Sequence, residues 1–264
     1  MSDITILTAS LGRPSLAKLA EYVAAQTYRA DWLVIFDGSE ACDKGLQYLP
    51  SGTDYIVTHE GPPRGPSGEQ VRARALGEIG TRWCAFMDDD NGFHPDHVKL
   101  LVGALRSGNR FVSTRRVYVD PDMNPIAKED LTAELVDTNC SAIETQLLID
   151  AAKFTDENWR SPRPFYDRNL QGYLFARDIK ATIIPAYTVA YRVSRPEYVN
   201  WYRGKVAYET IASTILITGL WKPEDGAKPL SDLDYMRTTQ PPKPKGANTV
   251  ATVEMIDCSA PLKA

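Results

Sequence analysis

Three consecutive aspartates, Asp88, Asp89 and Asp90, follow an apolar run in the segment "AFMDDDNGFHPDH", residues 85–97. No cation stands next to them in the sequence, so their mutual repulsion is unfavourable unless a positive group lies close in space. A divalent cation is one such group, because Mg²⁺ is typically held by one or two carboxylates together with substrate phosphates. The pattern indicates either a cation site that uses Asp88 and Asp90, or an acidic turn before the helix expected near Pro95, where aspartate favours the helix dipole.

The place of this triplet in the fold depends on the elements around it, which alternate between strands and helices over the first 108 residues. Strand-like apolar runs occupy residues 4–9, 31–37, 54–59 and 82–88, and helical patterns occupy residues 15–26, 67–80 and 94–108. This alternation predicts an α/β fold with a mostly parallel central sheet and helices on both faces. Ligands of such sheets bind outside the carboxyl ends of the strands, at a switch in strand order. We therefore expect residues 10–13, Asp37 and residues 88–90 to converge on one edge of the sheet.

The second half of the chain has a more mixed pattern. It predicts two strands around a turn over residues 110–127, a helix over 141–154, a helix from about Asp167, a strand pair or one bent strand over 180–193, and a long or broken helix over 197–221. From residue 222 onward proline and lysine are frequent and the periodicity is lost, as in a flexible tail. We expect one domain over residues 1–221, made of halves 1–108 and 109–221, and a partly flexible extension over 222–264.

The overall composition is that of a soluble globular protein. Of the 264 residues, 43% are hydrophobic and 24% are charged, and the net charge of −4 gives no bulk attraction to nucleic acid or anionic lipid. The four cysteines form no C-x-x-C pair, and Cys84 lies inside an apolar run, which favours a reduced protein with Cys84 in its core. The first ten residues lack a signal-peptide pattern, and no apolar segment is long enough to span a bilayer. We expect a cytoplasmic location.

Several common nucleotide- and cation-binding motifs are missing from the sequence. The first strand is followed by "SLGRPS" and not by G-x-G-x-x-G, and the chain contains no G-x-x-x-x-G-K-[ST] phosphate loop. Neither "DDDNG" nor "DPDMNP" has the glycine and glutamate that an EF-hand requires at fixed offsets. Rossmann-type dinucleotide binding and EF-hand calcium binding are therefore disfavoured.

Three segments taken in order resemble glycosyltransferase family 2, which has the A-type nucleotide-sugar transferase fold. They are "ITILTASLGRPSLAKLAEYVAAQTYRADWLVIFDGSE", "VRARALGEIGTRWCAFMDDDN" and "FYDRNLQGYLFAR". The resemblance covers residues 3–193 and is strongest over the N-terminal half, and it depends on the order of the motifs and on the spacing from Arg72 to Asp88. It implies transfer of a sugar from a nucleoside-diphosphate sugar, UDP-linked by preference, with residues 1–108 as the nucleotide-binding half and 109–221 as the acceptor side.

The resemblance also implies which residues bind the donor nucleotide. Its base and ribose would be bordered by four residues of the loop after the first strand: Thr8, Ala9, Leu11 and Arg13. Asp37 in "FDGS" would accept a hydrogen bond from the base, commonly uracil, although Phe36 stands where the family has another aspartate. Arg72 would lie by the base or the phosphates, although the residue after it is alanine where the family has asparagine.

The aspartate triplet matches the D-x-D motif of that family through Asp88 and Asp90. Asp90 is implied to be the closest ligand of Mn²⁺ or Mg²⁺, and Asp88 or Asp89 is implied to lie nearer the ribose or the sugar. A metal at this position would neutralise charge on the diphosphate and on the leaving group.

Asp167 is the candidate catalytic base, because it matches the second residue of the family's Glu-Asp pair, with Tyr166 in place of the glutamate. An acceptor hydroxyl must lose its proton as it attacks the anomeric carbon, and a carboxylate within hydrogen-bond reach can take that proton. One base facing the leaving group implies inversion at the anomeric carbon. The structural alternatives stay open: Asp167 as a helix cap, Asp37 as a turn residue and Arg72 on a solvated helix face.

Two other functions also remain open. A nucleotidyltransferase of related fold would join a nucleoside triphosphate to a sugar phosphate, but its Gly-rich basic loop is poorly matched by "SLGRPS". A non-catalytic sugar- or nucleotide-binding module would keep the sheet and lose the base. The sequence does not identify the acceptor, which could be a glycan, a lipid, a small molecule, a protein or modified DNA.

Overall fold

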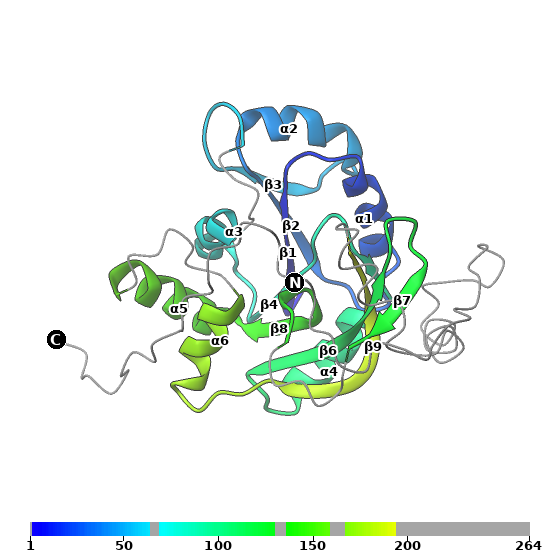
Figure 1. Cartoon of the computed structure of the whole chain (residues 1–264). Coiled ribbons are helices and arrows are strands. Elements are labelled where there is room, and N and C mark those ends of the chain that lie inside the picture. Colours follow the sequence, from blue (N-terminus) through cyan, green and yellow to red (C-terminus); the bar gives the residue numbers. More distant parts are fainter. Residues whose placement is uncertain (1, 64–68, 130–135, 159–166, 194–264) are drawn as a thin grey trace, which may run out of the picture.

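One mixed sheet organises the computed structural model, which describes residues 2–63, 69–129, 136–158 and 167–193 (Figure 1). In this described part nine strands pair, eight of them in the order β3-β2-β1-β4-β8-β6-β9-β5, while β7 pairs with β6. The strands are β1 (Ile4–Ser10), β2 (Asp31–Phe36), β3 (Asp54–Val57), β4 (Trp83–Phe86), β5 (Gly92–Phe93), β6 (Phe111–Val119), β7 (Pro125–Lys128), β8 (Ser141–Glu144) and β9 (Thr182–Arg192).

The four strands expected in the first half are all present and parallel. The chain runs outward from β1 through β2 to β3 and then returns to the other side of β1 with β4. Strand order therefore switches between β1 and β4, where the carboxyl ends of two adjacent parallel strands diverge into different connections. We call the side of the sheet on which β1, β2 and β4 end the site edge.

The second half adds strands of both directions. Strand β8 is antiparallel to both β4 and β6, and β9 is parallel to β6. It follows that β6 and β9 end at the site edge and that β8 begins there. The expected strands over 110–127 form the β6–β7 hairpin, and the segment 180–193 forms the one long strand β9.

One expected helix is wrong over its first residues. Ser141–Glu144 form β8, and the helix α5 begins only at Thr145. The segment is held as a strand because Ile143 pairs with Cys84 of β4 on one side and with Phe111 of β6 on the other. These partners lie far away in the sequence, so a local helical pattern could not reveal them.

Helices cover both faces of the sheet, as the strand–helix alternation predicts. They are α1 (Ser15–Ala24), α2 (Ser39–Gly45), α3 (Glu69–Ala75), α4 (His97–Arg106), α5 (Thr145–Asn158) and α6 (Asp167–Phe175), with short 3-10 helices at Leu46–Tyr48, Leu76–Glu78 and Thr138–Cys140. Leu16 of α1 and Leu101 of α4 pack in one core cluster with Ile6 of β1. Leu148 of α5 and Leu174 of α6 pack in the other cluster, with Leu7 of β1.

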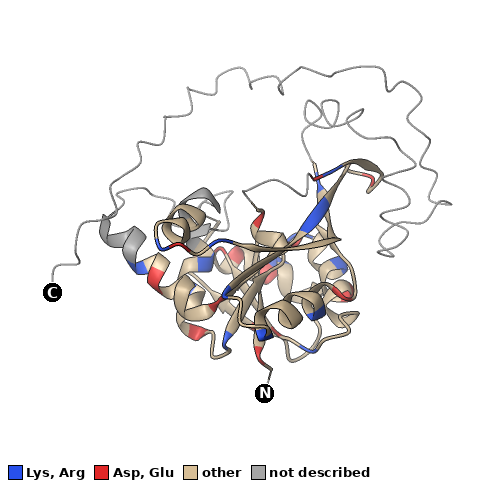
Figure 2. Cartoon of the chain, turned by 90° about the horizontal axis from the view of Figure 1, so that it is seen from below, with Lys and Arg blue, Asp and Glu red and all other residues tan. Residues whose placement is uncertain are grey.

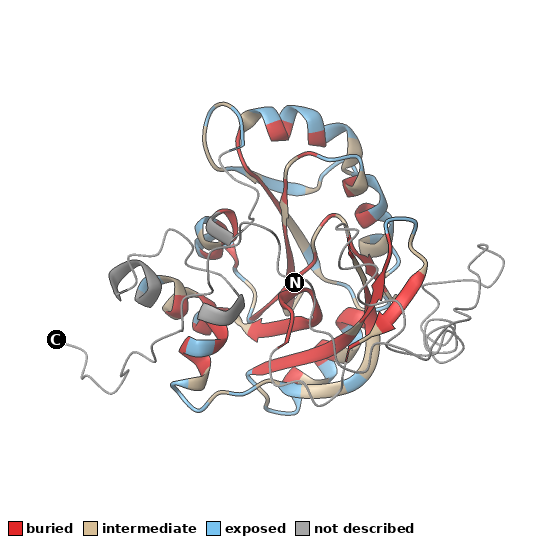
Figure 3. Cartoon of the chain, in the orientation of Figure 1, coloured by how far each residue is buried: buried red, intermediate tan, exposed pale blue. Residues whose placement is uncertain are grey.

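The burial pattern follows this layered arrangement. Figure 3 shows that most of the sheet is buried, whereas the outward sides of α1 and α2 are exposed. Adjacent residues of a strand point to opposite faces, so Ile6 and Leu7 contribute to the two different cores. In the view of Figure 2, the positions of acidic and basic residues are interspersed along the described ribbon.

The described cysteines are consistent with a reduced protein. Cys42, Cys84 and Cys140 are buried free thiols, which confirms Cys84 as a core residue, and burial raises its pKa to about 12. Cys258 lies outside the described residues. Among the helices of the described ranges, none combines the length and apolarity needed to cross a bilayer. The cytoplasmic location stays a prediction, and the expected helix over 197–221 and the extension over 222–264 also lie outside the described residues.

Candidate active site

A buried hydrogen bond joins the loops that follow β1 and β4 at the switch in strand order. The Ser10 hydroxyl donates to Oδ2 of Asp89 over 2.7 Å, and it accepts the Gly12 backbone N–H over 3.0 Å. The Asp37 backbone N–H, at the end of β2, donates to the Ser10 carbonyl over 3.2 Å. Ser10 is therefore the point where the three strand ends meet, and the expected convergence of these segments on one edge is confirmed.

Asp89 is the most buried of the three aspartates, with 6% of its surface exposed. Burial raises the pKa of its carboxyl to about 6, and the charges of Asp90 and Asp88 act in the same direction, against the hydrogen bond from Ser10 and the charge of Arg13. Its Oδ1 lies 4.0 Å from the Arg13 guanidinium. Asp89 thus anchors the loop through its buried hydrogen bond to Ser10, and its carboxylate is too buried to bind a ligand directly.

Asp90 is the most open of the three, with a side chain that is 43% exposed. Its Oδ2 lies 3.5 Å from Nη1 of Arg13, whose own side chain is half-exposed. Burial raises the pKa of Asp90, and the charge of Asp88 raises it further while Arg13 lowers it. A carboxylate and a guanidinium thus stand together at the site edge, where both can reach a ligand.

Asp88 has a protein partner on each carboxylate oxygen. Arg72 from α3 forms an ion pair with Oδ1, and the Asn139 amide donates to Oδ2 over 2.8 Å. The Arg72 guanidinium also lies 5.3 Å from the centre of the Phe86 ring, on the strand that leads into the triplet. The structure therefore brings Arg72 to the triplet from a helix that packs on the sheet, and because Arg72 is buried, the alternative of a solvated helix face is wrong.

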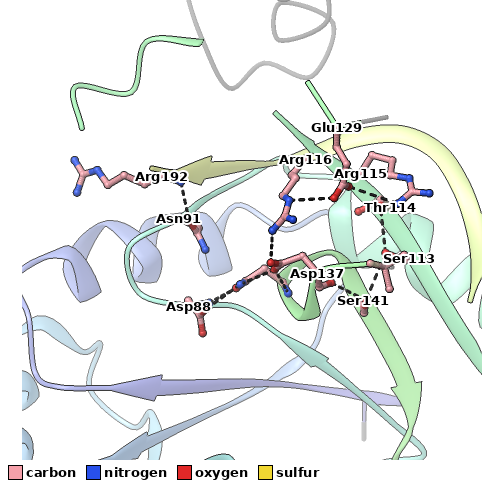
Figure 4. Close-up of polar contacts among 12 residues, drawn as sticks. Asp88, Asn91, Ser113, Thr114, Arg115, Arg116, Glu129, Asp137, Ser141 and Arg192 are labelled. Atoms are coloured by element: carbon pink, nitrogen blue, oxygen red, sulfur yellow. Dashed lines mark hydrogen bonds and ion pairs between the residues drawn. The ribbon is translucent and has the colours of Figure 1, made fainter. Parts of the chain in front are cut away.

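Behind Asp88, a chain of buried charges extends into the second half of the sheet (Figure 4). Asn139 bonds to Asp137 over 3.0 Å, and Asp137 forms an ion pair with Arg116 of β6. Nε of Arg116 lies 3.1 Å from Glu129, and Glu129 lies 3.6 Å from the fully buried Arg115. Burial alone would lower the pKa of Arg116, but the nearby charge of Asp137 and of Glu129 holds that pKa above its usual value.

No motif of the sequence marked this cluster as part of the site. One signal was present: two adjacent arginines stand inside the strand-like run "FVSTRRVYV", residues 111–119. Charged side chains are almost never fully buried unless they are paired, so the two arginines of that strand require acidic partners in the fold. Nothing local indicates that those partners are Glu129 and Asp137.

Asp37 lies in a turn after β2 whose conformation is restricted by close contacts with residues 59–62. Its Oδ1 is 3.9 Å from Nδ1 of His59, and the other ring nitrogen of His59 lies 2.9 Å from the Pro62 carbonyl. Gly38 has a φ of 98°, and a β-carbon there would come within 2.5 Å of the Gly61 carbonyl oxygen. Glycine is therefore required after Asp37, in a backbone conformation that few other residues could adopt, and this turn follows the backbone bond from Asp37 to Ser10.

The remaining residues expected around the nucleotide differ in their accessibility. Thr8 is fully buried, and its hydroxyl accepts a 3.0 Å hydrogen bond from the Trp32 indole. Ala9 and Leu11 are partly exposed at the end of β1. Their contact with a base or ribose stays a prediction.

Helix α6 begins at Asp167, which confirms the helix expected there, while the Asp167 side chain lies outside the described part of the structure. The helix is tied to the segment that carries Asp137, because the Gln171 amide donates to the Val136 carbonyl over 2.7 Å and accepts the Val136 N–H over 3.0 Å. The role of Asp167 as base stays a prediction.

The donor set suits a divalent ion only if a substrate supplies further ligands. Within the described ranges, no group of three or more His, Cys, Asp and Glu side chains is arranged to hold a metal. Asp90 offers an exposed carboxylate, and Asp88 is close enough to raise its pKa. Mg²⁺ is commonly bound by one or two carboxylates plus substrate phosphates, and this arrangement matches that description.

No family model matches the sequence, and no curated protein matches it. Solved structures do match in fold. TarS from S. aureus in complex with UDP-GlcNAc is 14% identical with a TM-score of 0.54, over 85% of this chain and 69% of that one. Glucosyl-3-phosphoglycerate synthase from Mycobacterium tuberculosis, in complex with Mn²⁺, UDP and glucosyl-3-phosphoglycerate, is 15% identical with a TM-score of 0.51, over 84% and 82%.

A third similar structure is that of a different kind of enzyme. CMP:2-keto-3-deoxy-manno-octonic acid synthetase, complexed with CTP, is 12% identical with a TM-score of 0.50, over 80% of this chain and 99% of that one. At such low identity these likenesses concern the fold alone. The chain has the A-type nucleotide-sugar transferase fold, as the resemblance of its sequence implied. The strand order, the helices on both faces and the similar solved structures all agree on this fold.

Proposed function

We propose that this chain is a metal-dependent glycosyltransferase that moves a sugar from a nucleoside-diphosphate sugar, UDP-linked by preference, to an acceptor hydroxyl. The observation that carries the proposal is the meeting of Arg13, Arg72 and the aspartate triplet at the switch between β1 and β4. A diphosphate needs both positive side chains and an acidic metal ligand, and open α/β sheets bind ligands at such a switch. Neighbours of the same fold have been crystallised with UDP-GlcNAc and with UDP and Mn²⁺.

The nucleoside end of the donor is assigned to the ends of β1 and β2. Asp37 is beside Ser10 and would accept a hydrogen bond from the base. Ala9, Leu11 and Arg13 would border the base and ribose. Thr8 would contribute through its backbone, because its hydroxyl already bonds to Trp32.

The diphosphate end is assigned to Asp90 and Arg72. A bound Mn²⁺ or Mg²⁺ would supply positive charge that stabilises the leaving nucleoside diphosphate. Asp90 would hold that ion, because its carboxylate is the most exposed of the triplet. Asp88 would join it as a ligand only by sharing an oxygen with Arg72 or Asn139, and Asp89 would support the loop from its buried position.

Asp167 is assigned as the base that accepts the proton of the acceptor hydroxyl. Support comes from the pairing of Gln171 with Val136, which ties the middle of α6 to the segment next to Asp137. A carboxylate on the side opposite the diphosphate leads to in-line attack and inversion at the anomeric carbon.

A nucleotidyltransferase is the second candidate, supported by the likeness to the CMP-sugar-acid synthetase, which extends over 99% of that chain. Such an enzyme would attach a nucleotide to its sugar substrate and release pyrophosphate. The two reactions differ in the product that accumulates: a nucleoside diphosphate for sugar transfer and pyrophosphate for nucleotide transfer.

The test is a thermal-shift screen of nucleotide sugars and nucleoside triphosphates, each with and without Mn²⁺. A ligand that binds only the native state raises the unfolding midpoint, so the donor should give the largest shift and should require the metal. The best ligand is then incubated with the protein, and UDP and pyrophosphate are both quantified. Release of pyrophosphate from a nucleoside triphosphate would favour the second candidate, and the absence of any metal-dependent shift would contradict both.

A further inference from the structure

We infer that Asn139 is a positioning residue that fixes the carboxylate of Asp88 and, through it, the guanidinium of Arg72 at the diphosphate site. The inference rests on the proposed function. Asn139 is 2% exposed and lies on the 3-10 helix Thr138–Cys140, directly before β8 begins at the site edge. It reaches Asp88 across 51 residues of sequence.

The Asn139 amide holds both the backbone and the side chain of Asp88. Its Oδ1 accepts the Asp88 backbone N–H over 2.7 Å, and its Nδ2 donates to Oδ2 of Asp88 over 2.8 Å. Two contacts from one planar group to one residue restrict the direction in which the carboxylate can point. The remaining oxygen of Asp88 is then directed to Arg72.

The second N–H of Asn139 determines which way round the amide lies. Nδ2 also donates to Oδ1 of Asp137 over 3.0 Å. In the reversed orientation, the amide oxygen would face the carboxylates of Asp88 and Asp137, and the NH₂ group would face a backbone N–H. An amide has one acceptor and one double donor, so asparagine suits this position and an isosteric aspartate would be repelled by both neighbours.

Asn139 is itself held by the buried charges behind it. Asp137 accepts the Asn139 backbone N–H over 2.9 Å and forms an ion pair with Arg116. The Arg116 guanidinium lies over two rings that contact each other, 5.0 Å from the centre of Tyr118 and 4.6 Å from that of Tyr191. A guanidinium fixed by two aromatic faces and by carboxylates has little freedom, so the support of Asn139 is rigid.

The expected consequence is on binding of the donor. Without Asn139, Oδ2 of Asp88 loses its donor, and the Asp88–Arg72 pair is free to reorient. Removing a group that holds a metal-binding residue in place typically lowers the affinity by about 10- to 100-fold. The loss should appear in the dissociation constant for UDP and Mn²⁺.

The experiment is a double-mutant cycle on the full chain, with UDP and Mn²⁺ binding measured by calorimetry for Asn139→Ala, Asp88→Ala and the double variant. We expect Asn139→Ala to weaken binding by about 10-fold and to add less than about 2-fold in the Asp88→Ala background, because the residue acts through Asp88. The control is Asn109→Ala, whose amide joins the Ala104 carbonyl to Thr182 at the opposite edge of the sheet and should leave binding unchanged.

A second variant, Asn139→Asp, separates positioning from space filling. It keeps the side-chain volume but places a carboxylate where the NH₂ group donates to two other carboxylates, so it should bind UDP and Mn²⁺ more weakly than Asn139→Ala. If Asn139 only filled space, Asn139→Asp should bind more tightly than Asn139→Ala. Equal losses from Asn139→Ala in both backgrounds, or wild-type affinity in a folded Asn139→Ala, would overturn the inference.

A ligand-free measurement keeps the two proposals apart. Thermal unfolding of the same four proteins should show that Asn139→Ala lowers the midpoint less when Asp88 is already alanine. If the wild type does not bind UDP, the proposed function fails, and this unfolding cycle still decides whether Asn139 and Asp88 are coupled; additive midpoints would then reject the inference as well.

Discussion

The hydroxyl of Ser10 donates a 2.7 Å hydrogen bond to the carboxylate of Asp89, 79 residues later in the chain. The bond crosses the switch in strand order and draws the middle aspartate of the triplet inward. Asp89 and Asp90 lie in a turn in which the Asn91 backbone N–H donates to the Asp88 carbonyl over 3.4 Å. Asp88 and Asp90 face other partners than Asp89, and both are more exposed.

Ser10→Ala should therefore destabilise the protein, because it leaves a buried carboxyl without its donor. An unsatisfied buried group costs about 1–3 kcal/mol, so we expect the free energy of unfolding to fall by about that amount, as measured by urea denaturation at pH 8. Ser107→Ala is the control, since the Ser107 hydroxyl makes an exposed bond to Gly103. If both substitutions changed the free energy of unfolding equally, the Ser10–Asp89 bond would contribute no more to stability than an exposed hydrogen bond.

Asp90→Asn should remove the carboxylate that we propose as the metal ligand while keeping the size of the side chain. Loss of a metal that stabilises the leaving diphosphate costs several kcal/mol, so kcat with Mn²⁺ should fall by about 100-fold or more. The measurement is UDP release at increasing Mn²⁺ concentration. Asp43→Asn, at an exposed position of α2, changes the net charge equally and should leave turnover intact. If excess Mn²⁺ gave wild-type turnover in Asp90→Asn without any change in affinity for the metal, the assignment of Asp90 would be wrong.

Asp167→Asn should separate chemistry from binding. A general base typically contributes about 10²- to 10⁴-fold to the rate, so kcat should fall by a factor in that range, while the dissociation constant for UDP and Mn²⁺ stays near that of the wild type. Asp150→Asn on α5 provides a control carboxylate, since Asp150 accepts an exposed bond from Gln146. Unchanged turnover in Asp167→Asn would move the base to another residue.

His97 should make stability depend on pH. It is fully buried against Phe93, with Nδ1 2.7 Å from the Thr188 hydroxyl, and burial lowers its pKa to about 3 from the usual 6.5. Below pH 6.5 the histidine is protonated in the unfolded chain but stays neutral in the folded chain. The free energy of unfolding therefore decreases as the pH is lowered, with a slope approaching about 1.4 kcal/mol per pH unit. This contribution is fully present above pH 6.5 and is lost progressively toward pH 3.

The measurement for His97 is the free energy of unfolding between pH 7.5 and 4.5 for the wild type and His97→Gln. The difference between the two proteins should shrink as the pH falls, because the variant has no imidazole to protonate. Thr188→Val removes the hydrogen-bond partner and keeps His97 buried, so it should lower stability and preserve the pH slope. Parallel curves for wild type and His97→Gln would show that His97 is not held neutral.

The parts of the fold that sequence predicts well are those set by local patterns. Strands β1, β2 and β4 are continuous apolar runs, and the residues after them meet at one edge because parallel strands end together. Arg72 is indicated by the family resemblance alone, since the residue pattern is equally compatible with a solvated helix face, and the structure shows it buried. The family resemblance adds the functional roles of these residues, which the apolar pattern alone does not contain.

The parts that sequence misses depend on contacts across long stretches of chain. Asn139 and Asp137 reach the site only because β8 inserts between β4 and β6, and the "SAIE" of that strand has no strand-specific pattern. The same insertion explains why the expected helix over 141–154 is wrong at its start. Buried partners such as Glu129 for Arg116 follow from the β6–β7 pairing, which a propensity argument does not specify.

The insertion of β8 beside β4 also determines which truncated fragments of the chain can have a complete sheet. A fragment that stops at residue 108 would contain every residue assigned to the nucleotide but would leave β4 with a bare flank, since β8 supplies its second neighbour. Such a flank presents unpaired N–H and C=O groups that recruit other chains. We expect that truncated piece to precipitate on expression, whereas a fragment extending past Glu144 has the missing neighbour available.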